Sequence, residues 1–150
     1  MTTVRIAVFL SSLFTIGLVY AGGANLTPME LPGGKIVTVS ELSSLMKSGV
    51  TIVDTRSAVN FGRGHIPGAV LIPYKGKSKN VPDFNGDLDR FSLDKLNLKP
   101  SDPLVFYSHG DTGWKSYKAA SYAIKQGFDK VYWFRNGLSA WQRSDQAIEH

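Results

Sequence analysis

A short loop with two glycines, Ser108-His109-Gly110-Asp111-Thr112-Gly113, is the part of the sequence best suited to chemistry. It follows the apolar run 104–107, which predicts a buried strand, and precedes a helix predicted over residues 114–126. Glycines let a backbone curl so that several N–H groups face one centre, and a helix N-terminus adds unpaired amides and the positive end of its dipole. We therefore predict an anion cradle over residues 108–114, with Ser108 at its base, Trp114 at its end and Lys115 as nearby charge. A plain strand-to-helix connection is the alternative.

Ser108 is also a candidate nucleophile, and a serine nucleophile needs a base beside it. His109 and His65 are the candidate bases, and Asp111 and Asp54 are the candidate orienting groups. His109 is adjacent to Ser108 in the chain, so we expect the two side chains to diverge. The sequence around Ser108 keeps only the last glycine of the nucleophile-elbow pattern. Serine hydrolysis is therefore a minor alternative.

Apolar runs alternate with helical patterns along the chain. Strands are predicted over residues 36–39, 50–53, 69–72, 104–107 and 131–134, and helices from an N-cap at Ser40 to about Gly49, over 93–96, over 114–126 and over 138–142. Unbroken apolar strands are typical of a mostly parallel sheet covered by helices on both faces, so the predicted fold class is α/β. Such sheets bind ligands beyond the carboxyl ends of their strands, where the loop 108–113 is expected to lie.

Cysteine is absent from all 150 residues. Its absence excludes disulfides, thiolate metal sites and persulfide intermediates. Three histidines and scattered carboxylates show no metal-ligand spacing, so we expect neither a metal nor another cofactor. The net charge of +5 favours anions, but no basic run interleaved with aromatic residues is present, so no nucleic-acid partner is expected. The alternating Lys75, Lys77 and Lys79 predict a solvated loop.

The first 21 residues have the three-part layout of a secretory signal peptide. A short basic start is followed by an apolar run over residues 6–19, and Val19 and Ala21 occupy the two positions that a signal peptidase recognises. The apolar run is shorter than the roughly 20 residues needed to span a bilayer, so membrane contact is expected only through the signal peptide. An uncleaved anchor is the alternative. Residues 22–34, rich in Gly and Pro, predict a flexible segment before a domain over 35–145, and the expected location is periplasmic or secreted.

Three separated signatures resemble the rhodanese (sulfurtransferase) family, and together they cover roughly residues 36–143. They are Val53-Asp54-Thr55-Arg56 with Gly64-His65-Ile66-Pro67-Gly68-Ala69, then the strand, loop and helix over 105–120, and finally residues 127–132 with 136–141. The resemblance implies a single rhodanese-like domain in which Asp54, Arg56 and His65 support the loops. It also implies a catalytic cysteine at position 108, which accepts a sulfane sulfur and passes it to an acceptor.

The sequence departs from the family pattern at both positions where the resemblance implies a thiol. Position 108 is serine, and Gly113 stands where an exported branch of the family has a second cysteine before tryptophan. The loop is also about two residues longer than is usual in the family. A serine hydroxyl is far less acidic than a thiol, whose pKa is about 8.5, and it cannot store a transferable sulfur. A designed replacement would account for Ser108 but not for Gly113.

We therefore expect a catalytically inactive rhodanese-like module in the cell envelope. It is expected to bind a small oxyanion such as thiosulfate, sulfite, sulfate or phosphate, or an envelope protein partner, through the loop 108–114. Asp111 is an awkward residue in an anion site, and if it pointed inward it would favour the protein partner. The alternative is a thiosulfate sulfurtransferase seen in a form without its cysteine.

Overall fold

Five parallel strands form the central sheet of the computed structural model, which describes residues 25–150. The strands lie in the order β1-β5-β4-β2-β3. Their bounds are β1 Lys35–Ile36, β2 Thr51–Asp54, β3 Val70–Leu71, β4 Leu104–Tyr107 and β5 Val131–Phe134. The helices are α1 Val39–Lys47, α2 Ala58–Gly62, α3 Trp114–Lys125 and α4 Gly137–Arg143, with single 3-10 turns at Gly86–Leu88 and Asp94–Leu96. The predicted signal peptide, residues 1–21, lies outside the described residues.

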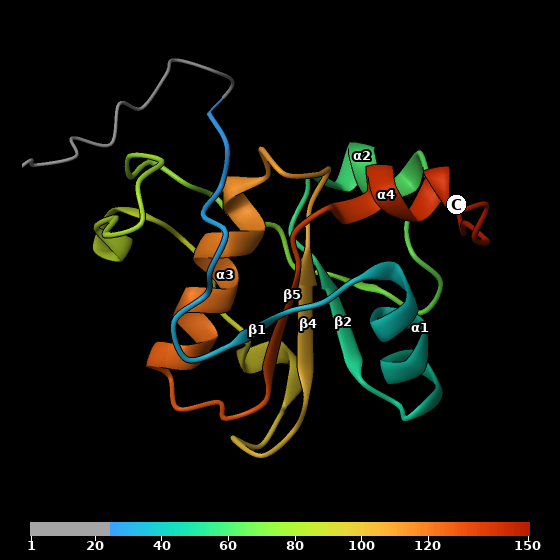
Figure 1. Cartoon of the computed structure of the whole chain (residues 1–150). Coiled ribbons are helices and arrows are strands. Elements are labelled where there is room, and N and C mark those ends of the chain that lie inside the picture. Colours follow the sequence, from blue (N-terminus) through green and yellow to red (C-terminus); the bar gives the residue numbers. More distant parts are fainter. Residues whose placement is uncertain (1–24) are drawn as a thin grey trace, which may run out of the picture.

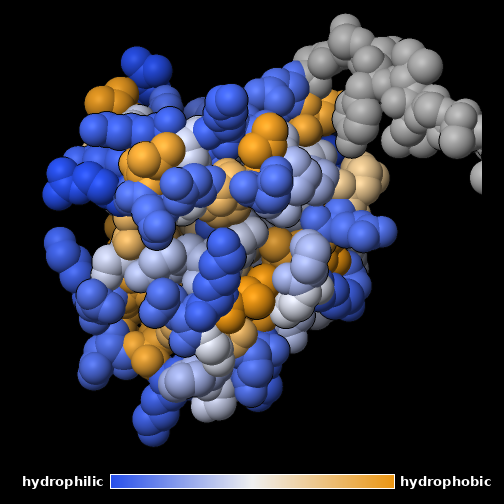
Figure 2. Space-filling model, turned by 90° about the vertical axis from the view of Figure 1, so that its left-hand side faces the viewer, coloured by the Kyte–Doolittle hydropathy of each residue, from blue (hydrophilic) through white to orange (hydrophobic). Residues whose placement is uncertain are grey.

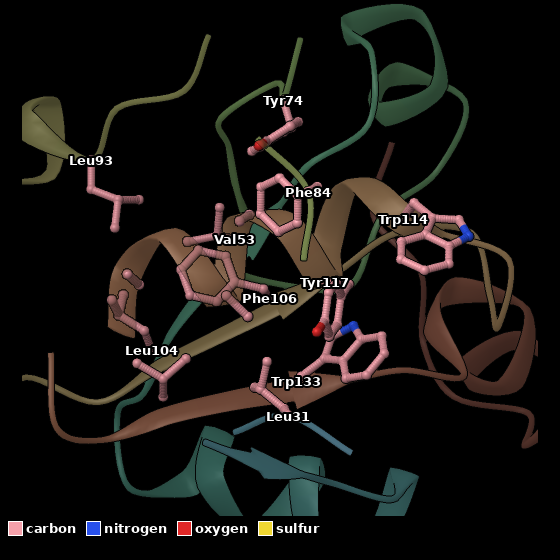
Figure 3. Close-up of a cluster of buried hydrophobic side chains, with 14 residues drawn as sticks. Leu31, Val53, Tyr74, Phe84, Leu93, Leu104, Phe106, Trp114, Tyr117 and Trp133 are labelled. Atoms are coloured by element: carbon pink, nitrogen blue, oxygen red, sulfur yellow. The ribbon is translucent and has the colours of Figure 1, made fainter. Parts of the chain in front are cut away.

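Helices cover both faces of the sheet, which confirms the predicted α/β class (Figure 1). Successive residues of a strand point to opposite faces, so β4 sends Phe106 into the cluster under α3 and Tyr107 into the cluster under α1 and α4. In the first cluster the rings of Tyr117 and Trp133 pack edge to face, 5.3 Å apart (Figure 3). Both clusters consist almost wholly of apolar and aromatic side chains, whose removal from water is the main force holding the sheet and helices together.

The first helix begins two residues earlier than the sequence predicts, and Ser40 is not its N-cap. Thr38 caps α1 instead: its Oγ1 accepts from the Glu41 amide at 3.2 Å, and the Glu41 carboxylate accepts from the Thr38 amide at 2.9 Å. This reciprocal capping box satisfies two backbone donors, whereas Ser40 lies inside the helix.

Two neighbouring strands end at the edge of the sheet where the loop begins. Asp54, the last residue of β2, is in register with Tyr107, the last residue of β4. The loop after β4 and the chain after β2 therefore start side by side. The Thr55 amide and hydroxyl both donate to the Tyr107 carbonyl, at 3.1 and 2.9 Å, and extend this pairing one residue beyond the strands.

The long irregular segment between β3 and β4 packs against α3 on one side of the molecule. Figure 2 shows that side as a mainly hydrophilic surface on which hydrophobic residues form small separate groups. Lys75, Lys77 and Lys79 are exposed there, as predicted. Among residues 25–150, no helix is long and apolar enough to cross a membrane.

Candidate functional site

A solvent-open cavity of about 400 Å³ lies beyond the carboxyl ends of β2 and β4. The loop after β4 and the start of α3 form its base, the residues after β2 form one wall, and the segment after β3 together with a lysine of α3 forms another. The lining residues are Arg56, Ser57, Asn60, Tyr74, Gly76, Ser78, Asn80, Ser108, His109, Thr112, Gly113, Trp114, Lys115 and Lys118.

Ser108 lies at the base of the cavity and is 4% exposed. Its side chain points toward Gly113: a Cβ placed on Gly113 would lie 2.7 Å from Ser108 Cβ and 3.0 Å from Ser108 Oγ. It would also lie 2.8 Å from the Gly110 carbonyl oxygen. Because real Cβ atoms do not approach other atoms so closely, the loop in this conformation requires glycine at position 113.

The backbone of the loop is held by the first turn of α4. The Leu138 amide donates to the Ser108 carbonyl at 3.0 Å, and the Ser139 amide donates to the His109 carbonyl at 2.9 Å. Gly137 makes this approach possible, because its φ is 57° and a Cβ there would lie 2.5 Å from the Ser108 carbonyl oxygen. The carbonyls of the loop base are thus turned toward α4.

Several loop amides have no partner in the described part of the chain, and those of His109 and Thr112 belong to residues that line the cavity. The Gly113 amide donates within the loop, to the Gly110 carbonyl at 2.8 Å. Within residues 25–150, no acceptor is found for the amides of His109, Gly110, Asp111 and Thr112. Helix α3 follows directly, and it adds the positive end of its dipole. Consecutive unpaired N–H groups beside a helix N-terminus are the arrangement in which proteins bind small anions.

The cations that line the cavity are not equivalent. Arg56 is buried and paired with Asp54, with its Nη2 2.6 Å from Oδ2. Lys118 is buried, donates to the Ser78 carbonyl and hydroxyl at 3.0 and 2.9 Å, and lies 4.0 Å from Asp89. Lys115 is exposed and forms no ion pair within the described part of the chain. Among these cavity cations, Lys115 therefore carries the positive charge that the protein neutralises least.

His109 is a neutral cavity group at pH 7. Partial burial and the nearby Arg56 guanidinium lower its pKa below the ordinary 6.5, and Lys115 adds to this, although Asp54 acts in the opposite direction. Protonation would add a second uncompensated positive charge to the cavity.

Asp54, Arg56 and Tyr107 form a buried group that braces the two loops. The Asp54 carboxylate accepts from Arg56 Nε and Nη2, and from the Tyr107 hydroxyl at 2.6 Å. Burial, with the Asp54 charge beside it, raises the pKa of Tyr107 well above its ordinary value. Arg56 Nη2 also donates to the Gly64 carbonyl at 2.8 Å, and the Ile66 amide donates to the Tyr107 hydroxyl at 3.1 Å. These contacts tie the ends of β2 and β4 to the loop after α2.

His65 lies outside the cavity lining, on the loop after α2. Its ring stacks on Phe61 with centroids 3.7 Å apart, and its Nδ1 lies 3.0 Å from the Phe61 carbonyl oxygen. Its backbone pairs with Glu149 in an isolated bridge. These contacts fix the loop and leave His65 no contact with Ser108.

Residues 25–31 lie against the loop, although the sequence predicts a flexible segment over 22–34. The Thr27 amide and hydroxyl donate to the Asp111 carbonyl at 2.8 and 2.6 Å, and the Trp114 indole donates to the Asn25 carbonyl at 2.8 Å. Arg135 donates to the Thr27 carbonyl at 3.0 Å, and Leu31 is buried in the core. A Gly/Pro-rich composition cannot foretell such contacts, because they depend on partners more than 80 residues away in the sequence.

The structure brings most of the predicted loop residues to the cavity. Ser108, His109, Thr112, Gly113, Trp114 and Lys115 line it, whereas Gly110 and Asp111 do not. The Asp111 side chain is exposed, so the condition that would favour a protein partner is not met.

Sequence reasoning missed the walls of the cavity. Ser57 and Asn60 belong to α2 and its cap, a five-residue helix too short to show a helical period. Tyr74, Gly76, Ser78 and Asn80 lie in irregular chain. That chain is organised by Asp89, which accepts from the Tyr74 hydroxyl at 2.7 Å and from the Lys77 and Ser78 amides at 2.6 and 2.7 Å. Only the density of Asp, Asn and Gly over 80–89 signalled an ordered turn-rich segment.

The geometry does not support a serine nucleophile. Within residues 25–150, no side chain lies within hydrogen-bonding distance of Ser108 Oγ to act as a base. The same part of the chain contains no group of three or more His, Asp or Glu side chains that could hold a metal ion.

Comparison with known proteins identifies relatives of the chain. Residues 38–144 match the rhodanese-like domain family. The chain is 33% identical over 112 residues to "Thiosulfate sulfurtransferase GlpE" of Shewanella oneidensis, covering 74% of this chain and 95% of that protein. The solved BH2092 protein of Bacillus halodurans matches with a TM-score of 0.58 at 24% identity, over 77% of this chain and 76% of that one. A thiosulfate sulfurtransferase of Pseudomonas aeruginosa matches with a TM-score of 0.57 at 19% identity, over 79% of this chain and 21% of that one.

Proposed function

Because the chain belongs to the rhodanese-like domain family, we propose that it is a member without a thiol nucleophile that binds a small oxyanion through the loop 108–114. We further propose that it works in the cell envelope, in the periplasm or outside the cell, and that it does not catalyse sulfur transfer. The candidate ligands are thiosulfate, sulfite, sulfate and phosphate. The geometry of the cavity supports the oxyanion proposal, and the signal-peptide pattern of residues 1–21 supports the proposed location.

The observation that carries the proposal is the serine at the base of the cavity. Ser108 occupies the position to which the resemblance assigns the sulfur-accepting cysteine, and the whole chain contains no cysteine. Within the described part of the chain a hydroxyl at this place has no base beside it, and it does not ionise near neutral pH. The sulfur-carrying atom that the resemblance implies at this position is therefore missing from this chain.

The remaining parts of the cavity support anion binding without chemistry. The amides of His109 and Thr112, two residues that line the cavity, lack an acceptor within the described residues, and Lys115 supplies a free positive charge at the N-terminus of α3. No Asp or Glu side chain of residues 25–150 lines the cavity. The exposed Asp111 favours a small oxyanion over a protein partner that presents one.

The first experiment is calorimetric titration of the purified protein with thiosulfate, sulfite, sulfate and phosphate. We expect at least one of them to bind, with an affinity that falls as the salt concentration rises. Lys115→Gln is expected to weaken binding, while Lys130→Gln, an exposed lysine at the opposite end of the sheet, is expected to leave it unchanged. Absence of heat with all four anions would refute the oxyanion proposal.

The second experiment separates this proposal from the sulfurtransferase alternative. Thiocyanate formation from thiosulfate and cyanide is measured for the protein and for Ser108→Cys. We expect no turnover by the protein itself. Turnover by Ser108→Cys but not by the unaltered protein would show that the thiol is the only part of a sulfurtransferase site that the cavity lacks. Turnover by the unaltered protein would refute the non-catalytic proposal.

A further inference from the structure

The cavity is much larger than a tetrahedral oxyanion. Such an ion has five non-hydrogen atoms and fills roughly the space of two or three waters, at about 30 Å³ each. The cavity measures about 400 Å³, which is within the range of about 300–1,000 Å³ typical of sites for small organic molecules. An inorganic anion on the loop 108–114 would leave most of this space unfilled.

The unfilled part is lined by neutral hydrogen-bonding groups. Asn60 and Asn80 both line the cavity, and the side-chain amide of neither has a hydrogen-bond partner among residues 25–150. Asn60 lies on α2 and Asn80 on the segment after β3, so the two amides come from different walls. Each can both donate and accept, as hydroxyl or amide groups of a ligand require.

A network of hydrogen bonds holds the wall near Asn80. The Asp89 carboxylate accepts from Tyr74, Lys77 and Ser78, and Lys118 donates to both oxygens of Ser78 at 3.0 and 2.9 Å. Because these groups already have hydrogen-bond partners within the protein, they shape the wall, and the two asparagines are left to bind a ligand.

The aromatic residues of the cavity offer little surface for stacking. Tyr74 is 3% exposed and Trp114 is 7% exposed, and the Trp114 ring already packs edge to face on Tyr117 with centroids 5.6 Å apart. A ligand with an aromatic body would therefore gain little here, whereas a hydroxylated or amide-bearing body would find partners.

We infer that the natural ligand is an organic anion with two parts: a terminal phosphate, sulfate or related oxyanion group held by the loop 108–114, and a polar, non-aromatic body held between Asn60 and Asn80. This inference rests on the proposed oxyanion site and names the class of molecule that the site takes.

Paired titrations of the purified protein test the inference. One pair is inorganic phosphate and glucose 6-phosphate, and the other is inorganic sulfate and glucose 6-sulfate. In at least one pair we expect the sugar ester to bind about tenfold more tightly, the gain that one or two well-made hydrogen bonds provide. Phenyl phosphate, titrated alongside, is expected to bind no more tightly than inorganic phosphate.

Substitutions show whether the gain comes from the proposed walls. Asn60→Ala and Asn80→Ala are each expected to reduce the sugar ester's advantage severalfold while leaving the affinity for the inorganic ion unchanged. Gln142→Ala, an exposed amide on α4 outside the cavity, is the matched control and is expected to change neither.

The outcomes distinguish this inference from the proposed function. Binding of inorganic ions without any advantage for the sugar esters, or a greater advantage for phenyl phosphate, would overturn the inference and leave the oxyanion site standing. An advantage that persists undiminished in both asparagine variants would also overturn it. No binding in either pair would refute the site itself and the inference with it.

Discussion

Replacement of Asp54 by asparagine should destabilise the protein severely. Asp54 is wholly buried, and its carboxylate faces the buried guanidinium of Arg56 at 2.6 Å and accepts from the Tyr107 hydroxyl at 2.6 Å. The substituted amide would keep the shape but leave the guanidinium without a counter-charge, and its NH2 group would face donors. Breaking one side of a buried ion pair costs about 3–5 kcal/mol. Since a domain is stable by only about 5–15 kcal/mol, the loss would be a large fraction of the total.

The measurements are urea unfolding and thermal unfolding of both proteins, each followed by tryptophan fluorescence and circular dichroism. At about 4 °C per kcal/mol for a chain of this size, the melting temperature should fall by roughly 12–20 °C. The control is Lys35→Gln, which removes an ion pair of similar length, 2.9 Å to Glu41, between side chains that are 61% and 42% exposed. We expect no resolvable loss there, because water screens exposed pairs.

Two results would refute this reasoning. One is a loss of less than about 1 kcal/mol for Asp54→Asn, below the range for breaking a buried pair. The other concerns the double variant Asp54→Leu/Arg56→Met, which removes both charges. It should lose less stability than the single change, since no unpaired charge stays buried. A double variant less stable than Asp54→Asn would show that packing, not charge pairing, dominates at this position.

Three further predictions concern the loop, the cavity and its wall. In urea unfolding, Gly137→Ala should lower stability by about 1–3 kcal/mol more than Gly49→Ala. Both glycines have positive φ, but only a Cβ at position 137 would meet backbone, 2.5 Å from the Ser108 carbonyl oxygen. Equal losses in the two variants would contradict this close approach. The affinity for sulfate or thiosulfate, whose own charge stays constant in this range, should rise as the pH falls through the lowered pKa of His109, since the imidazolium adds positive charge. Calorimetry of His109→Gln with the same anion should show a flat pH profile; an unaltered profile in this variant would assign the effect to another group. Burial works toward a higher pKa at Asp89, but the hydrogen bonds it accepts hold the pKa at about 2, below the ordinary 3.8. The contribution of Asp89 to stability is therefore complete above pH 4 and is lost as the pH falls toward 2. Asp89→Asn should be less stable at pH 7 and lose less stability on acidification; the same loss on acidification as in the unaltered protein would refute this.

The central elements could be predicted because their signals are local. β4 and β5 are unbroken apolar runs whose bounds the sequence predicts without error, and α3 differs from its prediction by a single terminal residue. The start of α1 was predicted wrongly because Ser40 is a good cap by type, whereas Thr38 has the glutamate three residues later that completes a capping box.

The site could be predicted only in part, for a physical reason. The base of the cavity lies within one stretch of chain, so a strand, two glycines and a helix suffice to indicate it. The walls depend on Asp89, which organises backbone 11 residues before it in the chain, and on Lys118, 40 residues from its partner Ser78. No local pattern encodes such pairings. Family resemblance supplied the Asp54–Arg56 pair, but not Asn60 or Asn80.

The contact between residues 25–31 and the loop has a practical consequence for anyone who labels this protein. Trp114, which lines the cavity, donates to the Asn25 carbonyl, and Thr27 donates to the Asp111 carbonyl in the same loop. A fluorophore or surface linker attached at Asn25 would sit beside Trp114 at the cavity and compete with incoming ligands for room. A label placed near Lys130, at the opposite end of the strands from the cavity, would avoid that interference. A binding experiment that fails with a label at Asn25 should be repeated with the label moved there.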